Sequence, residues 1–339
     1  MNSFKKAAIT TSLAALVFVS GDVASQAKDV TLKMGTVAPS GTPWSDELYG
    51  IKRRIEKESN KNIKLKIYLG GQLGGEHEIL QGIQRGRIQG GGLTATALAA
   101  AVPELDLIEV PYLFDSQKQA DCVLDKHLLE PFTQLFAEKG LVFVTWAENG
   151  YRNIGTKNKP IKTPGDLRGV KIRAQESKVH LAYWKKLGAS PVPIAVPEVL
   201  PALQTGVVEG FDQTALMTLA AEWQTSIKFY TVTEHIYQPA AIVFSKSFFD
   251  GLSPDQKKIL MGEGNGLAPR ARRAVRRLSG QLIKALESNN VQIIKLSGGE
   301  KAAFKNAASG LAEQMVGQIG GKSSMIYAKI KAGKAACGR

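Results

Sequence analysis

The chain has 339 residues, of which 44 are lysine or arginine and 30 are aspartate or glutamate, so its formal net charge is +14 at pH 7. This length is too great for one compact hydrophobic core and predicts two domains. A basic excess of this size attracts anions, but the basic residues are spread along the chain, which argues against a nucleic-acid partner.

The N-terminus has the features of a secretory signal peptide. Two lysines, Lys5 and Lys6, precede an apolar stretch over residues 7–19, and Ser25, Gln26 and Ala27 form a cleavage site. Thirteen apolar residues rising about 1.5 Å each are too short to cross a bilayer core of about 30 Å. We therefore expect residues 1–27 to be removed and the mature protein, with a net charge of +13, to lie in the periplasm and not in the membrane.

The first half of the mature chain alternates between strand and helix patterns. Residues 30–35 alternate like a strand, a helical pattern with Trp44 and Leu48 on one face follows, and residues 63–69 alternate again. Such a β-α-β unit implies a parallel sheet with helices on its faces. The later elements are a helix at about 76–86, an apolar segment at 103–114, a helix at about 116–136 and a strand at 141–147.

A second series of elements begins at Tyr151 and predicts another α/β unit. Its strands are expected at about 151–156, 169–174 and 191–196, and its helices at about 177–187 and 197–205. A strand-like stretch at 240–245 precedes a helical stretch from Pro254 to about Ser288, which is long enough to bridge two domains. Its five arginines between 270 and 277 are interpreted as a solvated helix face. A strand near 291–296 and small-residue helices complete the chain.

Motifs for catalysis and cofactors are incomplete. His77-Glu78 begins a zinc-protease motif, but Gln81 stands where the second histidine is needed, so no metal is expected. Residues 320–323 are similar to a phosphate loop, but Val316 replaces its first glycine. No dinucleotide fingerprint or nucleophile elbow is present, and the four histidines are scattered. We expect no cofactor and no catalytic residue. Cys122 and Cys337 form no disulfide framework, and their pairing is left open.

Five segments in order resemble the solute-binding proteins of tripartite ATP-independent periplasmic (TRAP) transporters, the family typified by C4-dicarboxylate and sialic acid receptors. They are residues 70–76 (GGQLGGE), 110–114 (VPYLF), 149–152 (NGYR), 162–173 (KTPGDLRGVKIR) and 198–210 (EVLPALQTGVVEG). The resemblance spans nearly the whole mature chain. It implies a two-domain α/β periplasmic solute-binding protein fold, with a ligand cleft, a long domain-bridging helix and hinge closure.

On this resemblance the chain divides into a first α/β domain, of residues 28–149 plus about 239–280, and a second of residues 150–238. Residues 281–339 are expected to supply a C-terminal strand and helices that pack on both domains. The ligand is a small organic acid, and the partners are the membrane permease subunits of the transporter.

Arg173 is the principal candidate for ligand binding. In the resemblance, the arginine that ends the strand at 169–174 forms the main salt bridge to the ligand carboxylate. A guanidinium also matches carboxylate geometry with two parallel donors and stays charged. Its place at the carboxyl end of a strand is where open α/β sheets bind ligands. Arg152 is the second candidate, with a structural ion pair as the alternative, and Asn149 supplies a bendable approach to it.

Gln213 marks a departure from the family pattern. Many relatives have Glu-Asn-Pro at this point, with the asparagine touching the ligand, whereas this chain has Asp212-Gln213-Thr214. A glutamine amide still donates and accepts hydrogen bonds, but its extra methylene changes the pocket, so ligand identity cannot be copied from relatives.

Two further candidates have equally weighted alternatives. Glu76 begins a helix after the glycine turn, where it either meets a ligand group or is stabilised by the helix dipole. Trp146, like Trp44, Tyr151, Phe211 and Tyr237, either lines the cleft or belongs to the core.

Two other functions remain open. One is an exported enzyme for anionic substrates, with Glu76 or Glu148 as acid or base. The other is a binding protein that serves an ATP-driven transporter or a sensor kinase.

Overall fold

The computed structural model describes residues 29–338 and places nine strands in one sheet. The order is β2-β1-β3-β8-β4-β7-β5-β6, and β9 pairs with β8. The strands are β1 (Val30–Gly35), β2 (Ile63–Tyr68), β3 (Gly90–Thr94), β4 (Leu141–Thr156), β5 (Lys171–Ala174), β6 (Ser190–Pro193), β7 (Gly210–Gln213), β8 (Phe229–Ser245) and β9 (Gln292–Lys295). The predicted signal peptide, residues 1–27, lies outside the described residues.

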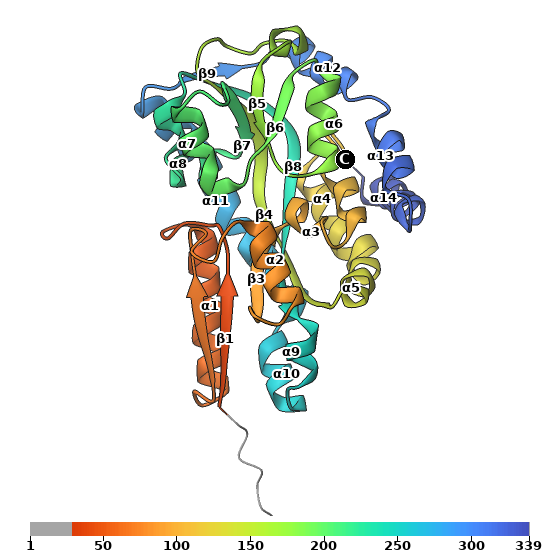
Figure 1. Cartoon of the computed structure of the whole chain (residues 1–339). Coiled ribbons are helices and arrows are strands. Elements are labelled where there is room, and N and C mark those ends of the chain that lie inside the picture. Colours follow the sequence, from red (N-terminus) through yellow and green to blue (C-terminus); the bar gives the residue numbers. More distant parts are fainter. Residues whose placement is uncertain (1–28, 339) are drawn as a thin grey trace, which may run out of the picture.

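Two long antiparallel strands, β4 and β8, run through both halves of the molecule (Figure 1). One end of β8 pairs with β3, which pairs in turn with β1. The other end of β4 pairs with β7, which leads to β5 and β6. Each half therefore has its own set of parallel strands, and the long pair joins them. This confirms the predicted fold of two α/β domains; the residue boundaries given above stay a prediction.

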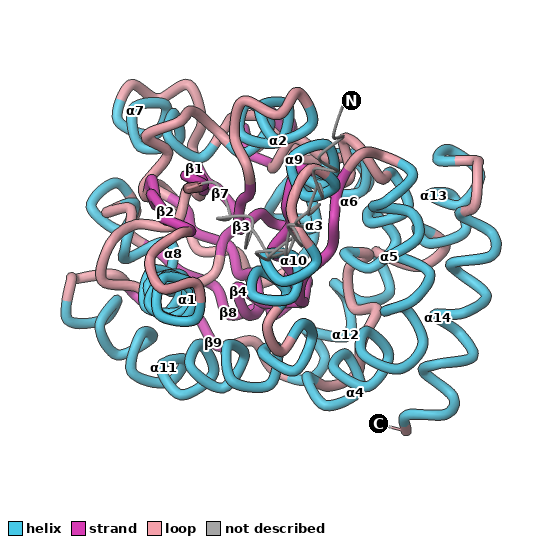
Figure 2. Tube along the Cα trace, turned by 90° about the horizontal axis from the view of Figure 1, so that it is seen from below, coloured by secondary structure: helices cyan, strands magenta, loops and turns pink. Residues whose placement is uncertain are grey.

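Helices cover both sides of the strands, which lie at the centre of the molecule in Figure 2. The longer helices are α1 (Pro43–Glu58), α2 (Glu76–Gln84), α5 (Leu129–Glu138), α6 (Lys178–Lys186), α10 (Pro254–Met261), α11 (Ala268–Ser288), α12 (Gly298–Ala307), α13 (Leu311–Ile319) and α14 (Ser323–Cys337). The shorter ones are α3 (Ala95–Leu98), α4 (Gln117–Cys122), α7 (Val199–Gln204), α8 (Ala215–Ala220) and α9 (Lys246–Asp250). No helix among the described residues is long and apolar enough to cross a membrane.

The long strand pair is irregular where it passes between the two halves. The pairing of β4 with β8 shifts register between Glu148 and Gly150, and Gly150 has a φ of +96°. A left-handed backbone at this point favours glycine, and an extra residue bends a strand locally. Asn149 and Arg152 are thus presented from a bent part of β4, between the two halves of the sheet.

The predicted helix from Pro254 to Ser288 is two helices. Gly262 and Gly264 have φ values of +50° and +53°, which end α10 and separate it from α11. Helix α11, without α10, contacts α1 in one half of the molecule and α8 in the other. It therefore supplies the bridge between the halves. Two other details differ: residues 103–109 form a 3₁₀ helix, and the helix predicted over 116–136 contains a π-helical turn at Val123–Leu128.

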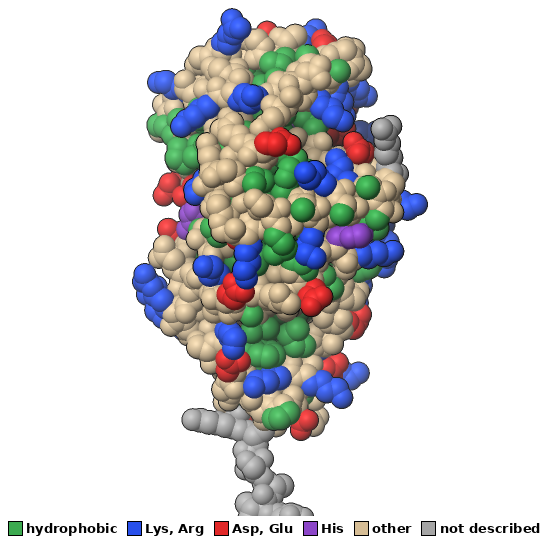
Figure 3. Space-filling model, turned by 90° about the vertical axis from the view of Figure 1, so that its right-hand side faces the viewer, with side chains coloured by type: hydrophobic (Ala, Val, Ile, Leu, Met, Phe, Trp, Pro, Cys, Tyr) green, Lys and Arg blue, Asp and Glu red, His purple; other side chains and the backbone are tan. Residues whose placement is uncertain are grey.

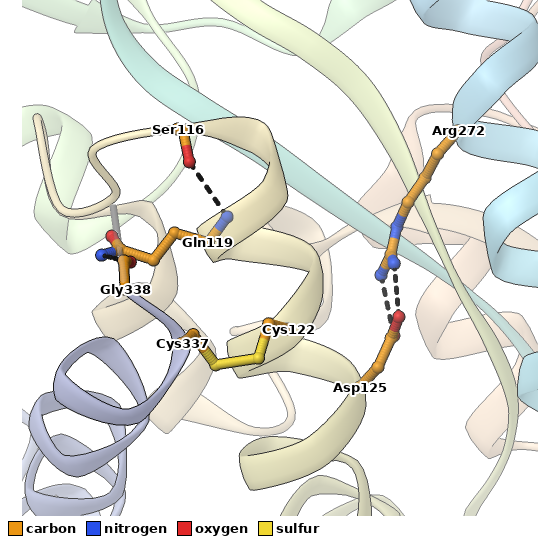
Figure 4. Close-up of a disulfide and its surroundings, with 7 residues drawn as sticks. All are labelled: Ser116, Gln119, Cys122, Asp125, Arg272, Cys337 and Gly338. Carbon is orange, nitrogen blue, oxygen red and sulfur yellow. Dashed lines mark hydrogen bonds and ion pairs between the residues drawn. A yellow bond between two sulfur atoms is a disulfide. The ribbon is translucent and has the colours of Figure 1, made fainter.

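Cys122 and Cys337 form a disulfide, with a Cα–Cα distance of 5.9 Å (Figure 4). It joins the end of α14 to the end of α4, and the side chain of Gln119 donates a hydrogen bond to the Gly338 carbonyl beside it. The C-terminal helices are therefore fastened to the first half of the molecule. On the face that these helices help to form, lysines and arginines are scattered among acidic and neutral side chains (Figure 3).

Candidate ligand-binding site

Polar residues of β4, β7 and β8 and of the segment after β5 come together where the two halves meet; Asn149 and Gln213 among them were predicted. Asn149, Gln213 and Gln175 line a cavity of about 50 Å³ together with Trp44 and Gln238. Gln175 follows Arg173 by two positions, so both project from the same face of the chain beyond β5. Arg173 does not itself line the cavity, but its strand β5 pairs with β7, which ends at the lining residue Gln213.

Arg173 is buried, with 1% of its surface exposed, and only part of its guanidinium is bonded. Its Nε donates to the Ile194 carbonyl at 2.9 Å, and the guanidinium lies 5.5 Å from the ring centroid of Trp223. Its Nη1 has no hydrogen-bond partner among the described residues. Burial and the neighbouring Arg152 lower the pKa of Arg173 to about 10, so it remains charged at neutral pH. A buried, charged and unpaired donor of this kind is suited to an anionic ligand.

Arg152 is also fully buried, but its charge is neutralised. Its Nε donates to Asp212 Oδ2 at 2.5 Å, and its Nη2 donates to the Asp212 carbonyl. Although burial opposes ionisation, Arg152 and His235 hold the pKa of Asp212 well below its usual value. The structure therefore shows the structural ion pair that was the alternative for Arg152.

Three glutamines surround the same guanidinium. The Oε1 atoms of Gln175, Gln213 and Gln238 accept from Arg152 Nη1 at 2.5, 3.3 and 3.0 Å. Gln238 also donates to Gln175 Oε1, so the amides bond to each other as well. Arg152 thus positions the polar side chains of the cavity. Gln175 and Gln238 were missed in the sequence; the period-two spacing from Arg173 pointed to Gln175, whereas Gln238 is found only through the pairing of β8 with β4.

Glu76 and Asn149 occupy the margins of the site. Glu76 accepts hydrogen bonds from the backbone N–H and the hydroxyl of Thr94, at 2.7 and 2.9 Å. Burial raises the pKa of Glu76. Its carboxylate therefore binds β3 and not the cavity, while Thr94 lines the cavity. Asn149 lines it directly, and its amide donates to Gln238 Oε1 at 3.5 Å.

Trp146 lies in the hydrophobic core and not in the cleft. It is fully buried among Phe132, Phe136 and Phe143, with ring centroids 4.9–6.5 Å away. Successive side chains of a strand point to opposite faces of the sheet. Trp146 therefore points to the face opposite to that of Asn149, the cavity residue of the same strand. The core was one of its two alternatives. Trp44 does line the cavity, and its indole N–H donates to the Glu148 carbonyl at 3.2 Å.

Three of the five arginines interpreted as a solvated face are ion-paired, and one of them, the exposed Arg270, pairs with Glu47 of α1 at 2.9 Å. Arg276 forms two bonds with Asp121, both at 2.7 Å, and two with Glu148. Arg272 is buried and forms two bonds with Asp125, at 2.7 and 3.0 Å (Figure 4). The interpretation was wrong for this side of α11, because acidic residues of α4 and its π-helical extension face it. Arg273 and Arg277 are exposed.

A second cavity, of about 550 Å³, lies between α11, α8 and β4 and shares Asn149, Thr214 and Leu216 with the smaller one. Its charged residues are Glu234 and Arg276. Glu234 is ion-paired with Lys301, and Arg276 is ion-paired with Asp121 and Glu148. It therefore offers no unpaired cation. One group of possible metal ligands occurs in the described part of the chain, Cys122, His127 and Cys337, and its two cysteines are joined in the disulfide.

Residues 34–318 match the family model described as bacterial extracellular solute-binding protein, family 7. The chain belongs to this family. Its members are binding proteins of the periplasm and not enzymes, which confirms the class and location predicted from the sequence. The two-domain fold of this chain is likewise the fold of solved TRAP solute-binding proteins.

Two curated relatives and one solved structure illustrate the similarity. The 2,3-diketo-L-gulonate-binding periplasmic protein of Escherichia coli is 28% identical over 75% of this chain and 76% of its own. The C4-dicarboxylate-binding periplasmic protein of Rhodobacter capsulatus is 27% identical over 92% and 93%. The sugar acid binding protein of Advenella mimigardefordensis, solved with galactonate, is 25% identical, with a TM-score of 0.86 over 91% of this chain and 99% of that one.

Proposed function

We propose that this periplasmic solute-binding protein captures a small organic acid, with Arg173 as the anchor for its carboxylate, and delivers it to the membrane subunits of a TRAP transporter. The observation that carries the proposal is the buried, unpaired Nη1 of Arg173, two residues before Gln175, which lines the cavity together with other amide and hydroxyl side chains. A buried guanidinium with an unused donor is costly unless an anion completes it.

The relatives support a carboxylate as the ligand. The three proteins described above bind 2,3-diketo-L-gulonate, C4-dicarboxylates and galactonate, and each of these ligands is a carboxylic acid. They differ in size, in the number of carboxylates and in hydroxyl groups. What they share is the group that an arginine recognises with two donors.

The remaining candidate residues have supporting roles in this proposal. Gln213 and Asn149 contact the ligand body from the cavity wall, Arg152 orients the glutamines, and Glu76 fixes Thr94. Closure bends the long strands near 149–150 and 238–239, the boundaries of the two predicted domains. Export depends on the signal peptide at residues 1–27. Charge-assisted hydrogen bonds of about 1.5–3 kcal/mol each, with apolar burial, supply the roughly 8 kcal/mol that micromolar binding needs.

The two carboxylates proposed for an enzyme are both occupied. Glu76 is bonded to Thr94, and Glu148 accepts from Arg276 and from the Tyr237 hydroxyl at 2.7 Å. Neither is placed to move a proton at the cavity. A role with an ATP-driven transporter or a sensor kinase has no observation in its favour here.

A thermal-shift screen of the mature protein tests the proposal, because a ligand that binds only the folded state raises its melting temperature. Mono- and dicarboxylates, keto acids and sugar acids are each compared with the corresponding primary amide. We expect at least one acid to stabilise the protein and its amide to have no effect. Stabilisation by neutral compounds alone would refute an anionic ligand.

A further inference from the structure

The cavity wall divides into an apolar side and an uncharged polar side. Trp44, Val196, Leu216 and Met217 form the apolar side, from α1, α8 and the loop after β6. The polar side consists of amides and hydroxyls, and no charged side chain lines the cavity among the described residues. A ligand group that enters beyond Arg173 therefore meets either hydrocarbon or a neutral dipole.

The charges around the cavity leave room for one anionic group. Arg152 is neutralised by Asp212, at 2.5 Å, and His77 lies 3.6 Å from Glu176. Among these cations, Arg173 is thus the one with a donor atom, Nη1, that forms no hydrogen bond within the protein. A second carboxylate would lose its hydration without gaining a counter-charge, which costs several kcal/mol for a buried ion.

The polar side chains are themselves largely satisfied by each other. The Gln238 amide donates to Gln175 and, at 3.4 Å, to the Thr96 hydroxyl. The Gln175 amide donates to the Thr94 hydroxyl at 3.5 Å, and the side-chain Oε1 of Gln213 accepts from the Thr214 backbone N–H at 2.8 Å. Few donors and acceptors remain for a ligand that carries a hydroxyl on every carbon, and unmatched buried hydroxyls weaken binding.

The size of the cavity sets a similar limit. Its volume of about 50 Å³ is enough for roughly four water molecules at about 10–15 Å³ each. A ligand of a few carbon atoms fits such a space, with its carboxylate reaching toward Arg173. Longer acids need space beyond this cavity, and the larger cavity shares Asn149, Thr214 and Leu216 with it.

We propose that the ligand is a compact monocarboxylate with an apolar body, and that the site excludes dicarboxylates and polyhydroxylated sugar acids. The proposal rests on the proposed function, since it takes Arg173 as the anchor. It adds that Trp44 and Met217 recognise hydrocarbon, and that the neutral amides discriminate against a second charge.

Calorimetry with a matched series of four-carbon acids tests this class. The mature protein is unfolded, freed of bound solutes and refolded, and butyrate, 2-oxobutyrate, succinate and 2,3,4-trihydroxybutyrate are titrated in turn. We expect butyrate or 2-oxobutyrate to bind most tightly, succinate about 100-fold more weakly, and the trihydroxy acid at least about tenfold more weakly. In Met217→Lys, which adds a cation to the apolar side, the preference over succinate should fall at least about tenfold.

The same experiment with Arg173→Gln separates the two proposals. If succinate or the trihydroxy acid bound as tightly as the other acids, the proposed ligand class would be overturned. If that binding were lost in Arg173→Gln, the proposal that Arg173 anchors the carboxylate would still stand. Binding of any acid that is unchanged in Arg173→Gln would overturn the anchor itself. A failure of all four acids to bind would also overturn the class, because each is small enough for the cavity.

Discussion

Arg152 and Arg173 are both buried, yet their surroundings give them different roles. Arg152 has a carboxylate partner and three amide oxygens, whereas Arg173 has one carbonyl and an aromatic ring. Removing one member of a buried ion pair leaves the other charge buried without a partner, whereas removing an unpaired charge leaves no buried charge behind. Substitutions of the two arginines should therefore have different effects on the free energy of unfolding.

We expect Arg152→Gln to lower the free energy of unfolding by about 3–5 kcal/mol, because it leaves Asp212 buried without its counter-charge. Arg173→Gln, the matched control, should leave stability unchanged or raised. Urea unfolding of the ligand-free proteins measures both values. Equal losses in the two variants would contradict the distinction.

Asp106 gives a pH-dependent prediction. Burial raises the pKa of Asp106 from 3.8 to about 6. The hydrogen bond that its carboxylate accepts from the Ser177 hydroxyl, at 2.6 Å, lowers the pKa but does not cancel this effect. The folded protein therefore holds this proton more tightly than the unfolded chain, and stability is lost as pH rises from about 3.8 to about 6. Asp106→Asn should gain up to about 3 kcal/mol relative to the wild type across this interval. Urea unfolding at several pH values tests it, and a pH-independent difference would count against it.

Among the elements, α11 is held to the first half of the molecule by buried charges. Arg276 joins Asp121 of α4 to Glu148 of β4, and the carbonyl of Glu148 accepts from Trp44 in the cavity wall. This chain of contacts links the bridging helix to the ligand site through one residue of β4.

We expect Arg276→Gln to lower the free energy of unfolding by about 2–3 kcal/mol, less than for a wholly buried pair because the Arg276 side chain is 22% exposed. Exposed Arg277→Gln on the same helix is the control and should change stability by less than about 0.5 kcal/mol. Thermal unfolding monitored by circular dichroism compares the two. Similar losses would show that helix propensity, and not the ion pairs, is responsible.

The type of most elements was predictable from the sequence, but some bounds and the strands β3 and β7 were not. Alternation over residues 30–35 and 63–69 indicated β1 and β2 because their apolar residues face one side. Strand β3 was missed because its sequence, GGGLT, has too few side chains to show a pattern. Its glycines are needed for contact: a Cβ on Gly92 would lie 2.7 Å from the Trp44 ring. The break at Gly262 was overlooked because isolated glycines also occur inside helices.

In the whole molecule, the disulfide fastens the C-terminal helices to the first half. The two cysteines are 215 residues apart, so sequence alone left their pairing open. We expect the double variant Cys122→Ser/Cys337→Ser to lose about 2–4 kcal/mol of stability. Hydrogen exchange should accelerate in α14, with ligand affinity unchanged, because neither cysteine lines the cavity. Unaltered exchange in α14 would contradict this role.

The joining of the two halves also depends on contacts that one sequence does not reveal. Strand β4 was predicted as two shorter strands, and only residues 240–245 of β8 were predicted, since middle residues such as Gly150 and Pro239 interrupt the alternating pattern. Arg173, Gln213 and Asn149 were identified through the family resemblance. The neutralisation of Arg152 depends on Asp212, which pairing of β4 with β7 brings next to it.

The most direct test of the account is the affinity of wild-type protein and Arg173→Gln for the acid that the thermal-shift screen identifies, measured by calorimetry beside its primary amide. We predict that the wild type binds the acid at least about 100-fold more tightly than the amide, and that the variant loses most of this preference while keeping its fold. An undiminished preference for the acid in Arg173→Gln would contradict the assignment of Arg173 as the carboxylate anchor.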